Sequence, residues 1–155
     1  MMRFLPVGLD VRGKSCLVVG GGSVGTRKVL TLNRAGAVVT VVSPAVTGEL
    51  AAEIRAGRAR WVKGSFRDEH LTGALVVVAA TDDEAVNATV VRLAAESGAL
   101  GCDASSAERS QVIFGALLEN DDVTVAVFTD GRDPARARDT RNQIAKHVTP
   151  GRKPE

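Results

Sequence analysis

Short runs of apolar residues recur along the chain, and segments with helically spaced apolar positions lie between them. Residues 15–19 read SCLVV and residues 37–42 read AVVTVV, which is typical of strands buried on both faces of a parallel sheet. Residues 24–35 place apolar side chains at helical spacing, and Gly36 follows where the end of a helix favours glycine. The pattern therefore predicts a strand, a helix and a second strand within the first 43 residues.

The alternation of strands and helices continues to residue 102. Strands are predicted over residues 59–63, 74–80 and 99–102, and helices over residues 50–56 and 83–97. Thr81 and Glu84 have the spacing of a capping box, so Thr81 and Asp82 are candidate caps for the second of these helices. Because strands joined by helices form parallel sheets with right-handed crossovers, we expect a Rossmann-like, doubly wound α/β sheet.

The last third of the chain departs from this alternation. Residues 112–117 and 123–128 are apolar runs separated by the polar sequence ENDD, which favours a short β-hairpin. Residues 134–148 predict a terminal helix with a proline near its first turn. We therefore expect a Rossmann domain over residues 1–111 and a distinct segment over residues 112–155.

A glycine-rich loop follows the first predicted strand directly. The sequence GGGSVG satisfies the pattern GxGxxG with Gly20, Gly22 and Gly25, which permit a tight turn, close approach of a pyrophosphate and close packing of the helix. The loop opens a predicted helix, whose first N–H groups and dipole favour an anion. These features predict dinucleotide binding, whereas the alternative is a glycine turn that only permits tight packing.

The end of the second strand bears on the choice of dinucleotide. An acidic residue about 20 positions after the loop normally contacts the ribose of NAD. Here the strand ends in Ser43-Pro44-Ala45, with neither a carboxylate nor an arginine that would suit a 2′-phosphate. The motif alone separates NAD and NADP poorly, and we predict NAD. The expected cofactor-binding residues are Gly20, Gly22, Ser23, Val24 and Gly25 at the pyrophosphate, Ser43, Pro44 and Ala45 beside the adenosine, and Ala79, Ala80 and Thr81 at the next strand end.

Composition narrows the class of protein. An apolar share of 45% and a charged share of 25% are typical of a globular domain. We expect a cytoplasmic protein without a membrane partner, since no apolar run reaches about 18 residues and the start lacks a signal-peptide pattern. Cys16 and Cys102 have no CxxC spacing, and His70 and His147 form no ligand pair, so no metal site is predicted. The 3% aromatic content argues against a nucleic-acid partner.

Positive charge is concentrated at the end of the chain. Residues 131–155 contain seven basic and three acidic residues, a net charge of +4, whereas the rest of the chain has a net charge of −2. This distribution suits either a polyanionic partner or a solvated terminal helix, and the sequence leaves both open.

Several strings along the chain match the landmarks of one known family. They are LPVGLDVRGKSCLVVGGGSVGTRK at residues 5–28, VVSP at 41–44, AATDD at 79–83 followed by Val86-Asn87, IFGALL at 113–118, and Asp130-Gly131 followed by Pro134 and Ala137. In these strings the chain resembles the precorrin-2 dehydrogenase family, the Rossmann part of bifunctional sirohaem synthases. The resemblance covers nearly the whole chain.

The resemblance implies a specific reaction. Members oxidise precorrin-2 to sirohydrochlorin with NAD in sirohaem biosynthesis, so the implied substrate is a tetrapyrrole polycarboxylate. Several members form dimers through the region after the sheet, which implies a homodimer with residues 112–148 at its interface. Relatives commonly continue into a helical module beyond Glu155, so part of the substrate pocket or dimer contact would be truncated here.

The proton acceptor is the point at which this chain departs from the family pattern. Relatives carry an aspartate before the IFGA-like segment, and a gapless count back from Ile113 places Ser105 at that position. A hydroxyl is a poor general base unaided, whereas Asp103 lies two residues earlier, and a shorter loop would bring it to the same place. We predict Asp103 as the catalytic base, with Ser105 as the other candidate; a turn-capping Asp103 with no base in use is the alternative.

Two other functions stay open at this point. The absence of an aspartate at position 105 would suit a regulatory domain that binds NAD without catalysis. Some family members also insert iron into sirohydrochlorin, so the resemblance leaves ferrochelatase activity as a further alternative, through carboxylates rather than histidines.

Overall fold

The structure is a computed structural model of the chain, and it describes residues 2–120 and 123–148. These residues form two compact units. One unit is Pro6–Val112, and the other combines the remaining described residues from the two ends of the chain. The boundary falls one residue after the expected one, and the first residues of the chain group with the second unit, where Phe4 N lies 3.4 Å from Asp130 Oδ1.

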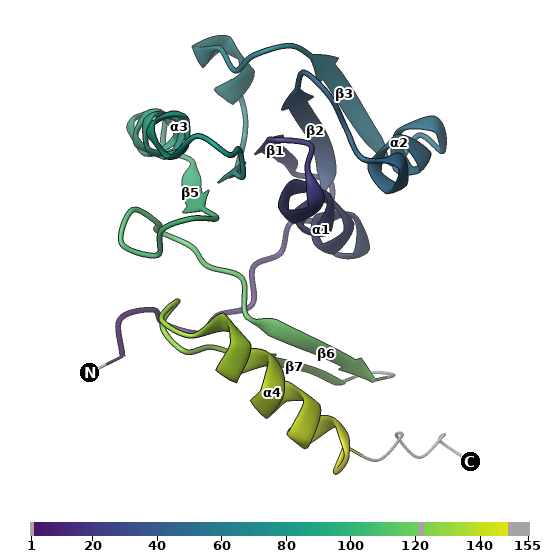
Figure 1. Cartoon of the computed structure of the whole chain (residues 1–155), viewed down its shortest axis with the longest axis vertical. Helices are drawn as coiled ribbons and strands as arrows, with labels where there is room; N and C mark the ends of the chain where they lie inside the picture. Colours follow the sequence, from purple (N-terminus) through teal and green to yellow (C-terminus); the bar gives the residue numbers. More distant parts are fainter. Residues whose placement is uncertain (1, 121–122, 149–155) are drawn as a thin grey trace. The chain divides into compact units, whose positions relative to one another are not determined.

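The larger unit contains a five-stranded parallel sheet in the order β3-β2-β1-β4-β5 (Figure 1). Its strands are β1 (Ser15–Val19), β2 (Val38–Ser43), β3 (Ala59–Lys63), β4 (Val76–Ala79) and β5 (Leu100–Asp103). This order places the first strand in the middle. The chain adds β2 and β3 on one side of β1 and then crosses over to add β4 and β5 on the other side, as in dinucleotide-binding folds. The predicted Rossmann-like fold is confirmed.

Three α-helices and one short 3₁₀ helix connect these strands. They are α1 (Ser23–Arg34), α2 (Gly48–Arg55), η1 (Asp68–Leu71) and α3 (Glu84–Glu96). The sequence pattern did not predict η1, because four residues are too few to show helical spacing. All three predicted helices of this unit are present, with ends that differ by one or two residues.

Valine-rich strands form the centre of the sheet, where both faces are covered. Alternate residues of a strand point to opposite faces, so Leu17 and Val77 join one apolar cluster together with Val90 and Ala94 of α3. The neighbouring Val18, fully buried, points to the face covered by α1. Because both faces of the central strands are buried under helices, the carboxyl ends of β1, β4 and β5 are held in fixed relative positions.

The start of α3 corrects one prediction. Asp83 is the N-cap, and its Oδ1 accepts hydrogen bonds from Ala85 N at 2.8 Å and Val86 N at 3.2 Å. The predicted capping box of Thr81 with Glu84 is wrong, because the helix begins two residues later than such a box requires. Neither Thr81 nor Asp82 caps the helix.

The smaller unit contains the antiparallel strands β6 (Ala116–Asn120) and β7 (Val123–Val127) and the helix α4 (Pro134–Ala145). The predicted hairpin and terminal helix are present, and Arg141 Nη1 of α4 donates to Leu117 O of β6 at 2.8 Å. The first strand begins four residues later than predicted, because Gln111 N and Val112 N pair with Gly101 O of β5 instead. The basic residues Arg152 and Lys153 lie outside the described residues.

None of the helices in the described part of the chain is long and apolar enough to cross a membrane.

Candidate functional site

The glycine loop is packed so tightly that three of its glycines have no room for a side chain; a Cβ on Gly21, for example, would lie 2.4 Å from the carbonyl oxygen of Ala45. A Cβ on Gly20, whose φ is 113°, would lie 2.3 Å from the carbonyl oxygen of Ala80. A Cβ on Gly25 would lie 2.0 Å from the carbonyl oxygen of Gly20. The loop is therefore pressed against the end of β4 on one side and the first turn of α1 on the other.

Gly22 differs from its neighbours because it faces open space. It is the N-cap of α1, it makes no side-chain capping bond, and a Cβ there would meet no atom within 4 Å. Ser23 beside it is exposed and Val24 is half-buried. A helix N-terminus without a side-chain cap, next to open space, is the arrangement that binds pyrophosphate in dinucleotide folds. Tight packing and open space at the helix N-terminus thus belong to different glycines of the same loop.

Ser43 ties the end of β2 to this loop. Its buried hydroxyl donates to Ala45 O at 2.6 Å and accepts from Gly21 N at 3.0 Å. Thr47 N donates in turn to Gly21 O at 3.0 Å. Pro44 and Ala45 are exposed beside the loop. The structure thus brings the predicted residues of the first two strand ends together, with Ser43 supporting the loop from inside.

We expect Ser43→Ala to destabilise the chain by about 1–3 kcal/mol, because it leaves the buried Gly21 N–H without its acceptor. Urea unfolding measures this change. Ser15→Ala is the matched control, because Ser15 is exposed at the start of β1. A Ser43 variant as stable as the Ser15 variant would contradict this role for the hydroxyl.

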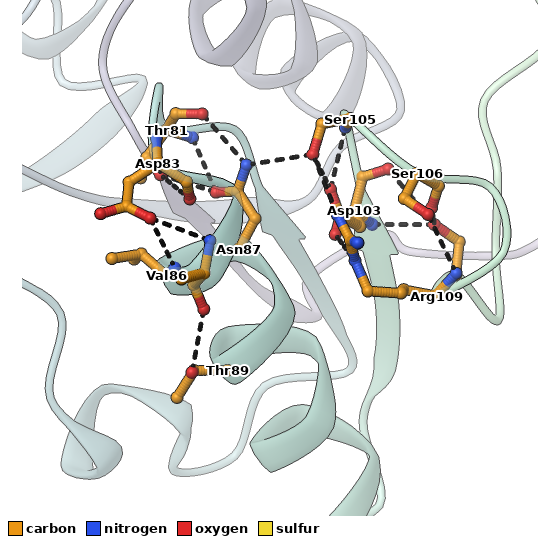
Figure 2. Close-up of polar contacts among 11 residues, drawn as sticks. Thr81, Asp83, Val86, Asn87, Thr89, Asp103, Ser105, Ser106 and Arg109 are labelled. Carbon is orange, nitrogen blue, oxygen red and sulfur yellow. Dashed lines mark hydrogen bonds and ion pairs between the residues drawn. The ribbon is translucent and has the colours of Figure 1, made fainter.

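The end of β4 supplies a second set of contacts. Ala79 is fully buried, so its side chain belongs to the core, whereas Ala80 and Thr81 lie at the edge of the unit's interior. Thr81 N and Thr81 Oγ1 donate to Asn87 Oδ1 at 3.0 and 2.7 Å, and Asn87 Nδ2 donates to Thr81 O at 3.0 Å (Figure 2). The side chain of Asn87 holds the backbone that follows β4.

The end of β5 carries the two predicted catalytic residues. Asp103 Oδ1 accepts from Ser105 N at 2.9 Å and from Ser105 Oγ at 2.6 Å, and Asp103 Oδ2 accepts from Arg109 Nε at 2.6 Å (Figure 2). The Asp103 side chain is 0% exposed, whereas Ser105 is exposed. The two candidates are therefore one hydrogen-bonded pair rather than alternatives.

Burial and hydrogen bonding act in opposite directions on the pKa of Asp103. Burial raises this pKa, but the hydrogen bonds from Ser105 and Arg109 together outweigh burial and lower it. The carboxylate is thus ionised at neutral pH. Its buried oxygens are bonded to two groups that reach the surface, the Ser105 hydroxyl and the Arg109 guanidinium, and of these the hydroxyl is the one that can pass a proton to the carboxylate.

Sequence reasoning missed Asn87 and Arg109. Asn87 Nδ2 and Arg109 Nη2 each lie 3.4 Å from Ser105 Oγ, so they complete a chain of contacts from Thr81 to Asp103 (Figure 2). From the sequence, Asn87 is only one of the family landmarks. Its position on the apolar face of the predicted helix is the one sequence feature that would have indicated a buried amide. Arg109 gave no signal, because it lies in a loop without periodicity.

Across the described ranges, no group of three His, Cys, Asp or Glu side chains is placed to bind a metal ion. Cys16 and Cys102 are both buried free thiols, and burial raises the pKa of Cys102 to about 11.

Comparison with known proteins was made on both sequence and structure. A family model described as putative NAD(P)-binding matches residues 7–116. The chain is 38% identical over 143 residues to siroheme synthase 1 of Pectobacterium atrosepticum and to siroheme synthase 1 of Aeromonas salmonicida. Each match takes in 92% of this chain but only 30% and 31% of the relatives, so the chain spans about a third of their length.

Among solved structures, SirC, a precorrin-2 dehydrogenase, superposes with a TM-score of 0.83 at 29% sequence identity. The match covers 94% of this chain and 72% of that one. These likenesses agree with the resemblance carried by the sequence landmarks.

Proposed function

The chain belongs to the putative NAD(P)-binding family, and from this membership we propose that it is an NAD-dependent dehydrogenase that oxidises precorrin-2 to sirohydrochlorin in sirohaem synthesis. The likeness to SirC carries the proposal, because it extends over 94% of the chain at 29% identity. The chain covers about a third of the siroheme synthases, so the proposal concerns this one reaction.

The residues of the glycine loop fit the cofactor. Gly22 and Ser23 would hold the pyrophosphate at the start of α1, where open space and uncapped N–H groups meet. Pro44 and Ala45 would flank the adenosine, and Ala80 and Thr81 border the loop at the end of β4. With no acidic residue and no arginine in Ser43-Pro44-Ala45, we propose NAD. The chemistry that NAD supplies when bound is acceptance of a hydride.

The reaction also releases a proton. Oxidation removes two hydrogens from precorrin-2, one as hydride and one as a proton, so a proton acceptor is needed. We propose that the exposed Ser105 hydroxyl takes this proton while its own proton passes to Asp103 Oδ1, 2.6 Å away. A weak base suffices, since loss of hydride leaves a cationic, acidic macrocycle.

A direct assay tests this function. When protein, NAD and precorrin-2 are mixed, NADH absorbance should appear at a catalytic rate together with the sirohydrochlorin spectrum. Binding of NAD without NADH formation would instead identify a regulatory domain. Iron-dependent loss of the sirohydrochlorin spectrum without NAD would identify a ferrochelatase.

We also propose a homodimer formed through β6, β7 and α4. A two-stranded hairpin is only marginally stable by itself, and Val123 of β7 is 47% exposed, so a second copy of the chain would cover this apolar surface.

The exposed basic residues Arg132, Arg136 and Arg138 would attract the carboxylates of the substrate. Sedimentation of the chain at twice the monomer mass would support the dimer. The cytoplasmic location, like the lack of nucleic-acid and membrane partners, stays a prediction from the sequence.

A further inference from the structure

Asn87 is a buried amide whose hydrogen-bonding capacity is fully used. It is 1% exposed, in the first turn of α3. Its Oδ1 accepts from the backbone N and the hydroxyl of Thr81, and its Nδ2 donates to Thr81 O and Ser105 Oγ. Because the two ends of the amide meet groups of opposite kind, its orientation is fixed.

This amide lies where two neighbouring strands end. Backbone pairing between β4 and β5 ends at Ala79 and Asp103, with one further bond from Ala104 N to Ala79 O at 2.9 Å. Beyond that point, Asn87 connects the residue two positions after β4 to the residue two positions after β5 (Figure 2). The first of these strand ends borders the glycine loop, and the second carries the proton-accepting pair.

We propose that Asn87 is a positioning residue, which fixes the Ser105 hydroxyl and its bond to Asp103 relative to the strand end beside the glycine loop. The inference rests on the proposed dehydrogenase function. It assigns Asn87 no contact with substrate or cofactor: its effect is exerted through Ser105.

The donor at position 87 also sets the direction of the Ser105 hydroxyl. Asn87 Nδ2 and Arg109 Nη2 both donate toward Ser105 Oγ, so the hydroxyl hydrogen is free to point only at Asp103 Oδ1. An acceptor at position 87 would compete for that hydrogen. It would leave the serine without a single defined proton path.

Asn87→Asp makes this change at nearly constant shape. The new carboxylate keeps an acceptor for Thr81 N and the Thr81 hydroxyl but loses the donor to Thr81 O and to Ser105 Oγ. A negative charge in the first turn is compatible with the dipole of α3, so the variant is expected to fold. It adds a second negative charge near Asp103, and a like charge raises the pKa of a carboxyl group.

Three other ionisable side chains of the described residues lie on the elements around Asn87, and each already has an interaction of its own. Arg109 is bound to Asp103, and Lys28 of α1 acts on Cys102, the thiol that precedes Asp103 on β5. Asp83, at the start of α3, directs its carboxylate to backbone amides of its own helix. None of these groups changes in the variant.

The expected result is a fall in kcat of about tenfold at pH 7, with the NAD dissociation constant unchanged. The pair must be ionised to accept a proton, so a raised pKa moves the acid limb of the kcat profile to higher pH. Thr89→Ala, on the exposed side of the same helix, is the matched control and should behave as the unaltered chain.

A double-mutant cycle with Ser105→Ala tests whether Asn87 acts through the serine. Adding Asn87→Asp to the Ser105 variant should change kcat by less than about twofold, because the group to be positioned is gone. An equal fall in both backgrounds, or an unshifted acid limb, would overturn the positioning role. If the unaltered chain does not turn over precorrin-2, the proposed function fails and the inference fails with it.

Discussion

Gly25→Ala should weaken NAD binding strongly and destabilise the chain. The added Cβ would lie 2.0 Å from the carbonyl oxygen of Gly20 and 2.9 Å from its carbonyl carbon. Both are backbone atoms, so α1 must move away from β1, and overpacking of this kind costs about 1–3 kcal/mol. We expect the dissociation constant for NAD, measured by titration calorimetry, to rise by about 100-fold or more, since about 2.7 kcal/mol corresponds to that factor.

Substitutions at two further glycines distinguish an effect on packing from an effect on NAD binding. Gly8→Ala is the control without effect, because a Cβ there meets no atom within 4 Å. Gly22→Ala also meets no protein atom, yet its Cβ would enter the open space assigned to the pyrophosphate. It should remain folded, with a loss of stability no larger than the exchange of an N-cap glycine for alanine costs, and should lose NAD affinity. Unchanged NAD affinity in both the Gly25 and the Gly22 variants would remove the loop from the cofactor site.

The second large effect is expected for Asp103→Asn. The substitution removes the charge proposed to receive the proton from Ser105 and breaks the ion pair with Arg109. Loss of a general base lowers turnover by about 100- to 10,000-fold. The NAD dissociation constant should stay the same, because no contact joins Asp103 to the glycine loop among the described hydrogen bonds.

Asp68→Asn is the matched control for this substitution. It removes one carboxylate from the same unit, on the exposed turn of η1, and should leave turnover unchanged. A melting curve for each variant establishes that the protein is folded. Turnover by a folded Asp103 variant at the rate of the Asp68 variant would show that this carboxylate is not the base.

Periodic segments account for what could be predicted from the sequence. The buried runs around Val18 and Val41 predicted parallel strands, and the glycines after the first run predicted the loop between strand and helix. These signals are local, because burial on both faces imposes an apolar run of fixed length on any such strand. The arrangement of sheet and loop followed from them with ends correct to within a few residues.

The polar network could not be predicted in the same way. Asp103 and Ser105 were treated as competitors for one position, because a sequence count cannot show that a turn places both in one hydrogen bond. Arg109 closes that turn from a loop without periodicity. The sequence spacing makes Thr81 a candidate helix cap as well as a cofactor-binding residue, but it gives no sign that the Thr81 hydroxyl is directed to Asn87. Each of these side-chain contacts depends on loop conformation.

The bare N-cap of α1 links folding to ligand binding. Glycine at an N-cap is only a few tenths of a kcal/mol less favourable than serine or aspartate, but Gly22 has no side chain to accept a hydrogen bond from the first N–H groups of the helix. A bound pyrophosphate would accept hydrogen bonds from these N–H groups and so take the place of a side-chain cap. A ligand that binds only the native state stabilises it by about 2.7 kcal/mol at 100 times its dissociation constant. The cellular pool of dinucleotide would then influence how much of this protein persists, as well as how fast it works.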